Sequence, residues 1–137
     1  MLPRLLVAAA LIAGAKTALA APALRAPVVV PIMDFHARVD DGRVILSWRR
    51  YKRDDFKSYQ LLKSTDTRLE YPDTPPLYSA DSADRTRFED GKLAVGTWRY
   101  RLCIVTVFGD RWVSPVVTVK IGPGDLRRDP PTEADFE

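Results

Sequence analysis

The sequence contains very few of the residues from which catalytic and metal-binding sites are usually built. Cys103 is the only cysteine and His36 the only histidine among 137 residues. An internal disulfide is therefore excluded, and a zinc site would have to be completed by carboxylates and water. A catalytic triad would have to use His36, and no Gly-x-Ser-x-Gly motif is present. We interpret His36 as a solvated residue of a strand.

The acidic residues do not supply a metal site either. They occur in short groups at 54–55, 81–84 and 89–90, without the ligand spacing of a calcium-binding loop. Such groups are typical of turns and of solvated surfaces. We expect no catalytic residue, no metal and no other cofactor.

The first twenty residues have the layout of a secretory signal peptide. Arg4 gives a basic start, residues 5–15 are apolar apart from Gly14, and 18–20 form a small-x-small site. A membrane-spanning helix needs roughly 20 apolar residues, and this run is shorter. We therefore expect cleavage after Ala20, export to the bacterial periplasm or beyond, and no membrane span afterwards. A lipoprotein is not expected, because no cysteine lies at the cleavage site.

The charge is almost balanced once the signal peptide is removed. The full chain has 21 basic and 18 acidic residues, and Arg4 and Lys16 belong to the signal peptide, which leaves a net charge of +1. A nucleic-acid-binding domain would show a concentrated basic face and a recognised motif. We expect no nucleic-acid partner.

Beyond residue 20 the apolar residues alternate as in short β-strands, and no helical period appears. Turns at 40–42 and 109–110 separate some of these strands, and an Asp-Gly pair is a strong hairpin signal. This pattern predicts a seven-stranded β-sandwich. The expected domains are a signal peptide (1–20), an extended lead-in (21–31), the sandwich (32–122) and a disordered charged tail (123–137). Strands are expected near 35–39, 44–48, 57–64, 77–79, 86–90, 98–108 and 112–121.

Five residues within this pattern resemble the fibronectin type III domain, an immunoglobulin-like sandwich. Trp48 stands where that family has its core tryptophan, and Tyr59 and Leu61 match the Tyr-x-apolar pattern of the next strand. Leu93 and Tyr100 match the corner before the longest strand, where the tyrosine hydroxyl typically caps nearby backbone. The resemblance implies that these residues form the core and that the domain presents binding surfaces.

Two further comparisons of motifs qualify this resemblance. Val95 replaces the proline of the usual Leu-x-Pro-Gly corner. The chain also resembles small bacterial secreted domains that carry Phe-x-x-Tyr-x-x-x-x-Ser, Tyr-Pro and Tyr-Arg-x-Cys, here at 56–64, 71–72 and 100–103. That likeness implies an exported setting and no particular reaction.

One end of the predicted sandwich combines basic and aromatic side chains. In this topology the loop after the second strand and the last hairpin lie at the same end. Aromatic rings beside arginines suit anionic or sugar groups, through stacking and forked hydrogen bonds. The alternative is that the aromatics close the core and the cations are solvated. The candidate binding residues are Arg49, Arg50, Tyr51, Lys52, Arg53, Phe108, Arg111 and Trp112.

The competing surface is the outer face of the strands at 57–64, 98–108 and 112–121. Alternation sends Leu62, Cys103, Val105 and Val116 to that face, which is unusually apolar for solvent. The Cys103 thiol there is either a small apolar filler or one half of a bridge between two chains. Docking through this face would give a salt-tolerant complex or a weak homodimer.

From these observations we expect an exported, non-catalytic module that binds a protein or an anionic envelope or extracellular component. A structural or assembly subunit that docks through the apolar sheet face is the first alternative. A small hydrolase is the remaining alternative, for which the sequence has no motif. Recognition by the basic loops predicts an affinity that falls with added salt.

Overall fold

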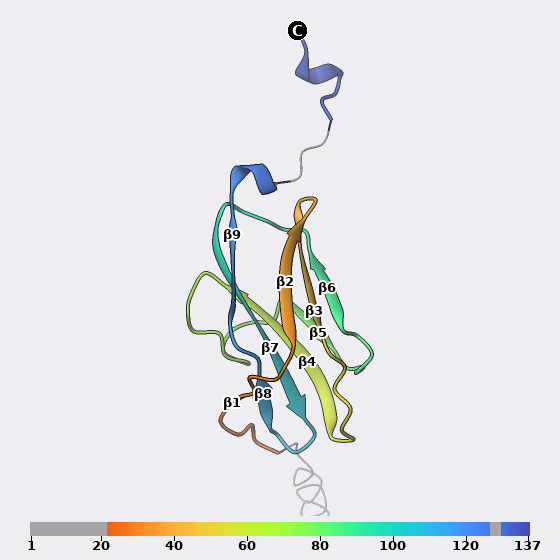
Figure 1. Cartoon of the computed structure of the whole chain (residues 1–137), viewed down its shortest axis with the longest axis vertical. Coiled ribbons are helices and arrows are strands. Elements are labelled where there is room, and N and C mark those ends of the chain that lie inside the picture. The colour runs from red at the N-terminus through yellow and green to blue at the C-terminus, as the bar shows by residue number, and fades with distance from the viewer. Residues whose placement is uncertain (1–21, 127–129) are drawn as a thin grey trace, which may run out of the picture.

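The computed structural model describes residues 22–126 and 130–137, so the expected signal peptide lies outside the described residues. In the described ranges two β-sheets pack face to face (Figure 1). The predicted all-β sandwich is confirmed. Within the predicted tail, η3 (Pro123–Asp125) and η4 (Glu133–Asp135) are short 3₁₀ turns, and residues 127–129 lie outside the described residues.

The smaller sheet contains three strands in the order β2 (Phe35–Asp40), β3 (Arg43–Trp48) and β6 (Arg87–Asp90). The hairpin between β2 and β3 turns at Asp41 and Gly42, whose φ angles are 49° and 75°. Asp and Gly tolerate this left-handed region, which explains the tight antiparallel register.

The larger sheet contains six strands. Its order is β1 (Val28–Val29), β8 (Arg111–Val113), β7 (Gly96–Thr106), β4 (Phe56–Ser64) and β5 (Tyr78–Ala80), and β9 (Val117–Ile121) also pairs with β7. The run expected as one strand at 112–121 is thus two strands, β8 and β9. Pro115 lies in the break, where it has no N–H to donate to a ladder.

The expected lead-in, at 21–31, contributes a strand of its own. β1 pairs in parallel with β8, with Val28 opposite Trp112 and Val29 opposite Val113. The Val30 amide then donates to the Val113 carbonyl at 2.8 Å. The N-terminal segment, defined here as residues 22–34, therefore lies against the β7–β8 hairpin.

The core lies between the two sheets. Trp48, Tyr59 and Tyr100 are 6%, 0% and 0% exposed, and Leu93 is half-buried against them. The indole of Trp48 meets the ring of Tyr59 edge-on, with ring centroids 5.5 Å apart. Alternate residues of β3, β4 and β7 point into this layer, as the period of a half-buried strand requires.

The corner near Tyr100 differs from the expected one. The Tyr100 hydroxyl donates to the Asp90 Oδ2 atom at 2.8 Å and not to backbone. The same carboxylate accepts from Lys63 Nζ at 2.6 Å, and Asp90 is only 2% exposed. Burial, helped by this carboxylate, raises the pKa of Tyr100 far above its ordinary value. A buried Lys–Asp–Tyr cluster thus links β4, β6 and β7.

Candidate functional site

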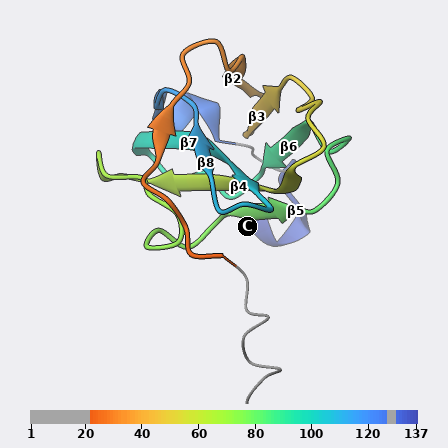
Figure 2. The ribbon, with the colours of Figure 1, turned by 90° about the horizontal axis from the view of Figure 1, so that it is seen from below.

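Three segments meet at one end of the sandwich, which we call the loop end. They are the N-terminal segment (22–34), the loop between β3 and β4 (49–55), and the β7–β8 hairpin (107–110). Figure 2 views the molecule from this end. The Val107 amide donates to the Asp55 carbonyl at 2.8 Å, and the Arg25 amide donates to the Gly109 carbonyl at 2.8 Å. These bonds join all three segments.

A groove of about 690 Å³ runs across the loop end. One wall is the N-terminal segment and the other is the loop at 49–53, while Ile104 of β7 and Trp112 of β8 lie between them. The remaining lining residues are Val30, Ile32, Met33, Asp34, Arg49, Arg50, Tyr51, Lys52 and Arg53. The structure thus places six of the eight predicted binding residues around one groove.

The charge of the groove comes mainly from Arg49, Lys52 and Arg53. All three are exposed, and among the described residues none of them forms an ion pair. Arg50 does form one: its Nε atom lies 2.6 Å from Asp84 Oδ1, and this hydrogen bond raises the pKa of the arginine. Three cations are therefore free to meet an anion.

Tyr51 fixes the loop at 49–55 on the core. Its amide donates to the Tyr59 hydroxyl at 3.0 Å, and that hydroxyl donates to the Ala83 carbonyl at 2.8 Å. The Tyr51 hydroxyl donates to Asp55 Oδ1 at 2.7 Å. Burial, followed by this hydrogen bond, raises the pKa of Tyr51. The loop is consequently held in place from within, with its cations directed outward.

Phe108 and Arg111 do not line the groove. Phe108 stands at the tip of the hairpin, 58% exposed. Arg111 points to the outer face of the larger sheet, because it neighbours Trp112 on β8 and consecutive residues of a strand point to opposite faces. Its Nε atom donates to the Arg25 carbonyl at 2.7 Å, and its Nη1 atom donates to the Tyr71 carbonyl.

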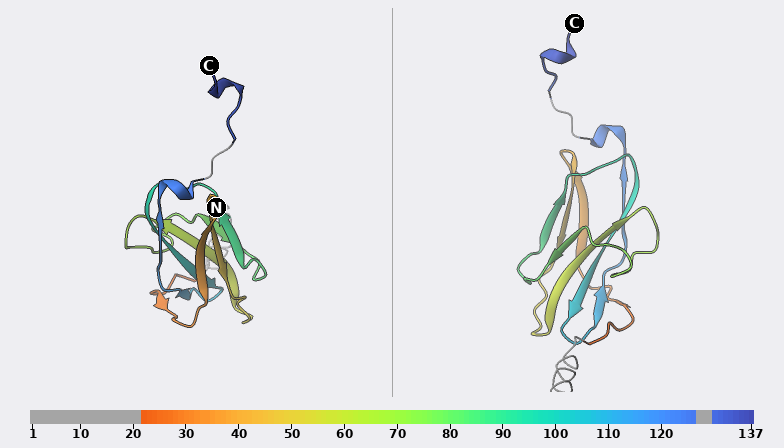
Figure 3. Two further views of the ribbon diagram at one scale, coloured as in Figure 1. Left: turned by 45° about the horizontal axis from the view of Figure 1, so that its top comes forward. Right: turned by 180° about the vertical axis from the view of Figure 1, so that it is seen from behind.

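The outer face of the larger sheet is not open to solvent. Leu62, Cys103 and Val105 do point to that face, but they are 0%, 0% and 3% exposed. Segment 65–76, which connects β4 to β5, covers it with Leu69 and Tyr71 (Figure 3, lime green). The prediction of an exposed apolar docking face is therefore wrong for these three residues. Val116, beyond the cover, is half-buried.

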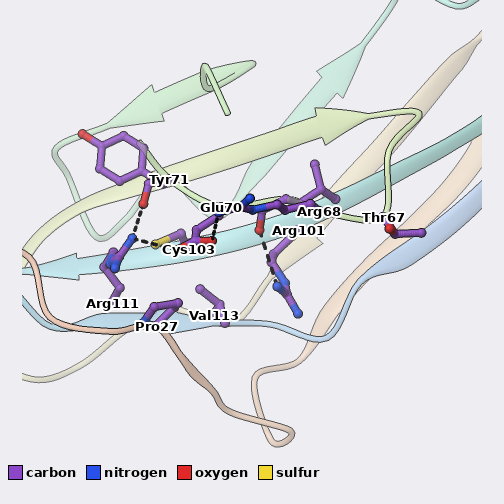
Figure 4. Close-up of a pocket in the computed structure, with 10 residues that line it drawn as sticks. Pro27, Thr67, Arg68, Glu70, Tyr71, Arg101, Cys103, Arg111 and Val113 are labelled. Atoms are coloured by element: carbon purple, nitrogen blue, oxygen red, sulfur yellow. Dashed lines mark hydrogen bonds and ion pairs between the residues drawn. The ribbon is translucent and has the colours of Figure 1, made fainter. Parts of the chain in front are cut away.

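A cavity of about 260 Å³ remains beneath the cover (Figure 4). Arg101 donates from Nε to the Ser114 carbonyl at 2.8 Å and from Nη1 to the Leu69 carbonyl at 3.4 Å. Arg111 Nη1 lies 3.7 Å from Glu70 Oε1. These arginines therefore hold the cover on the sheet.

Cys103 faces this cavity as an apolar filler and not as a nucleophile. It is a free, buried cysteine, and burial raises the pKa of its thiol to about 12. The thiol therefore stays protonated at neutral pH. Among residues 22–126 and 130–137, no three His, Cys, Asp or Glu side chains gather as a metal site, and no helix is long and apolar enough to span a membrane.

The binding residues predicted from the sequence do not include Val30, Ile32 and Met33, which form one wall of the groove. Their signal was present: residues 28–33 are apolar throughout and include one proline, which is unusual for a solvated lead-in. Apolar residues in such a segment need a surface to pack on. Here that surface is strand β8 and the loop opposite.

No protein-family model matches the sequence, and neither does any curated protein. Among solved structures the chain is similar to the sixth fibronectin type III domain of human fibronectin type III domain containing protein 3. The identity is 14% and the TM-score 0.51, over 80% of this chain and 94% of that domain. It is also similar to part of the pectate lyase PelI from Erwinia chrysanthemi in complex with tetragalacturonic acid. There the identity is 18% and the TM-score 0.52, over 63% of this chain and 27% of the lyase. These similarities show that the sandwich has the fold of a fibronectin type III domain.

Proposed function

We propose that the protein is an exported, non-catalytic binding module that takes an anionic group of a protein or envelope component into the groove of the loop end. One observation carries the proposal: the unpaired cations Arg49, Lys52 and Arg53 lie beside an apolar floor that includes Ile104 and Trp112. Cations without a partner retain their attraction for a ligand, and the floor covers its apolar flank.

The setting rests on the sequence. The signal-peptide pattern and the likeness to small bacterial secreted domains both support export. The buried, protonated Cys103 suits an oxidising compartment, because a thiol of this kind is hard to oxidise. The chemistry of the groove supports binding more than hydrolysis, since its ionisable side chains are mainly cations.

The proposal is tested by titrating anionic probes into the mature protein. Tetragalacturonate, the ligand named for the lyase complex, and a phosphorylated disaccharide supply carboxylate and phosphate groups. We expect calorimetry to detect binding that weakens as salt is raised from about 50 to 500 mM, because the Debye length falls well below 10 Å over this range. Arg49→Gln with Arg53→Gln should abolish it.

A matched variant controls for the loss of charge alone. Lys92 and Lys120 are also exposed cations, but they lie outside the groove. Lys92→Gln with Lys120→Gln removes the same charge and should leave the affinity within about twofold. Equal losses for both variants would show that only net charge matters, and the groove would then not be the site.

A further inference from the structure

The exposed apolar side chains of this domain are concentrated at the loop end. The described residues include eight large hydrophobic residues that are exposed, and six belong to the N-terminal segment or the β7–β8 hairpin. Those six are Leu24, Val28, Val29, Ile32, Val107 and Phe108. The other two, Val95 and Phe136, lie elsewhere in the chain. Exposed apolar clusters of this kind mark interaction surfaces.

The most exposed of these residues are at turns that project from the sandwich. Ile32 is 86% exposed in the turn between β1 and β2, and Phe108 is 58% exposed at the tip of its hairpin. Neither side chain serves the core. Single apolar groups at projecting tips can enter a soft, deformable phase without a complementary pocket, whereas a protein partner must supply one.

The charge around the tips favours an anionic surface. Arg49, Lys52 and Arg53 lie at the same end and have no acidic partner among the described residues. Each cation near an anionic bilayer contributes about 1 kcal/mol, or roughly fivefold in affinity.

We propose that the loop end binds the surface of a bilayer that contains anionic lipids, with Ile32 and Phe108 entering the headgroup region and the three cations meeting phosphates. This inference shares its cations with the function proposed above, but the apolar tips belong to it alone. The two ideas can therefore fail separately.

Vesicle co-sedimentation tests the proposal with the mature protein. Vesicles of phosphatidylethanolamine and phosphatidylglycerol should bind it, and phosphatidylcholine vesicles should bind at least about tenfold more weakly. Ile32→Ser with Phe108→Ser should reduce binding by about tenfold or more. Because both side chains are exposed, the melting temperature should not change. The control Val95→Ser with Phe136→Ser removes two other exposed apolar groups, 56% and 67% exposed, and should bind as the parent does.

Replacing all three cations by glutamine should reduce vesicle binding by about a hundredfold. The tip variant should still bind soluble anions in the calorimetric titration, because its groove cations are intact.

If soluble anions fail to bind but vesicle binding depends on the tips, the groove proposal is wrong and the membrane proposal is supported. If the parent binds neither vesicle type, or if the control variant loses as much vesicle binding as the tip variant, the membrane proposal is overturned. A parent dimer that the tip variant converts to monomer, without vesicle binding, would also overturn it in favour of a contact between copies.

Discussion

The backbone of Ala23 crosses so close to Gly109 that no side chain fits between them. A Cβ atom added at Gly109 would overlap the carbonyl oxygen of Ala23. Gly109 also has a φ of +85°, a conformation that other residues adopt only with strain. Around this contact Arg25 donates from Nη1 to Asp110 Oδ1 at 2.8 Å. The N-terminal segment is thus fastened at the hairpin before it forms the groove wall.

Gly109→Ala should detach the N-terminal segment from the β7–β8 hairpin. The new methyl group must displace the backbone at Ala23, and the left-handed conformation adds about 1–2 kcal/mol of strain. Trypsin should then cleave after Arg25 faster than in the parent, while the remaining sandwich stays folded. Gly124→Ala, where a Cβ meets nothing within 4 Å, is the control. Unchanged cleavage at Arg25 would mean that the segment is not held by this contact.

Mutations within the cluster of Lys63, Asp90 and Tyr100 should have non-additive effects on the unfolding free energy. Tyr100→Phe removes a hydrogen bond to a carboxylate and should cost about 1.5–3 kcal/mol of unfolding free energy. Asp90→Ala strands the half-buried Lys63 ammonium and should cost about 3–5 kcal/mol. Urea denaturation of the double variant should show a cost smaller than the sum of the two. Strict additivity would contradict a shared network.

Cys103 should make the fold sensitive to alkali. The ordinary thiol pKa is 9.0, and burial raises the pKa of Cys103 to about 12. Below pH 9 the Cys103 thiol keeps its proton in both the folded and the unfolded state, so its titration does not lower the unfolding free energy. Between about pH 9 and 12 only the unfolded state loses the proton, and unfolding free energy falls by up to about 1.4 kcal/mol per pH unit.

Cys103→Ala removes that dependence and supplies the comparison. Urea melts at pH 8, 9 and 10 should show the parent losing more stability than the variant as pH rises. The tyrosines, whose ordinary pKa is 10.0, are common to both proteins and cancel in the difference. Parallel curves for the two proteins would show that the thiol is accessible to solvent.

The folded unit should extend to Leu126. That side chain packs against the core, and the Gly122 amide donates to Asp125 Oδ2 at 2.8 Å. A chain truncated after Leu126 should keep its melting temperature, because residues 130–137 are exposed throughout. A chain truncated after Gly124 should lose about 1–2 kcal/mol. Equal melting temperatures for the two truncations would show that Leu126 does not contribute to the stability of the fold.

The strands that alternate between core and solvent could be predicted from sequence to within a few residues. The expected 57–64 corresponds to β4 at Phe56–Ser64, and the expected 44–48 corresponds to β3 at Arg43–Trp48. Both strands carry large apolar residues every second position, and burial of one face enforces that register. Pro115 marks the break between β8 and β9, whereas the apolar pattern alone predicts one strand across it.

The surroundings of a face could not be predicted in the same way. Alternation placed Cys103 on the outer face correctly, but it contains no information about which loop lies over that face. Leu69 and Tyr71, apolar residues in an otherwise polar segment, were the available signal. The hydrogen-bond partners of Arg111 were equally hidden, because they are backbone carbonyls of Arg25 and Tyr71, far away in the chain.

The described sandwich begins and ends at opposite poles: the N-terminal segment lies at the loop end, and η3 follows β9 at the other end (Figure 1). An affinity tag or fusion partner joined just before residue 22 would crowd the groove wall that this segment builds. Attachment beyond Leu126 leaves the wall untouched and points the basic groove away from the support. Sensor chips, crosslinkers and reporter fusions should therefore be joined at the C-terminal side, so that they do not block the groove when ligand binding is measured.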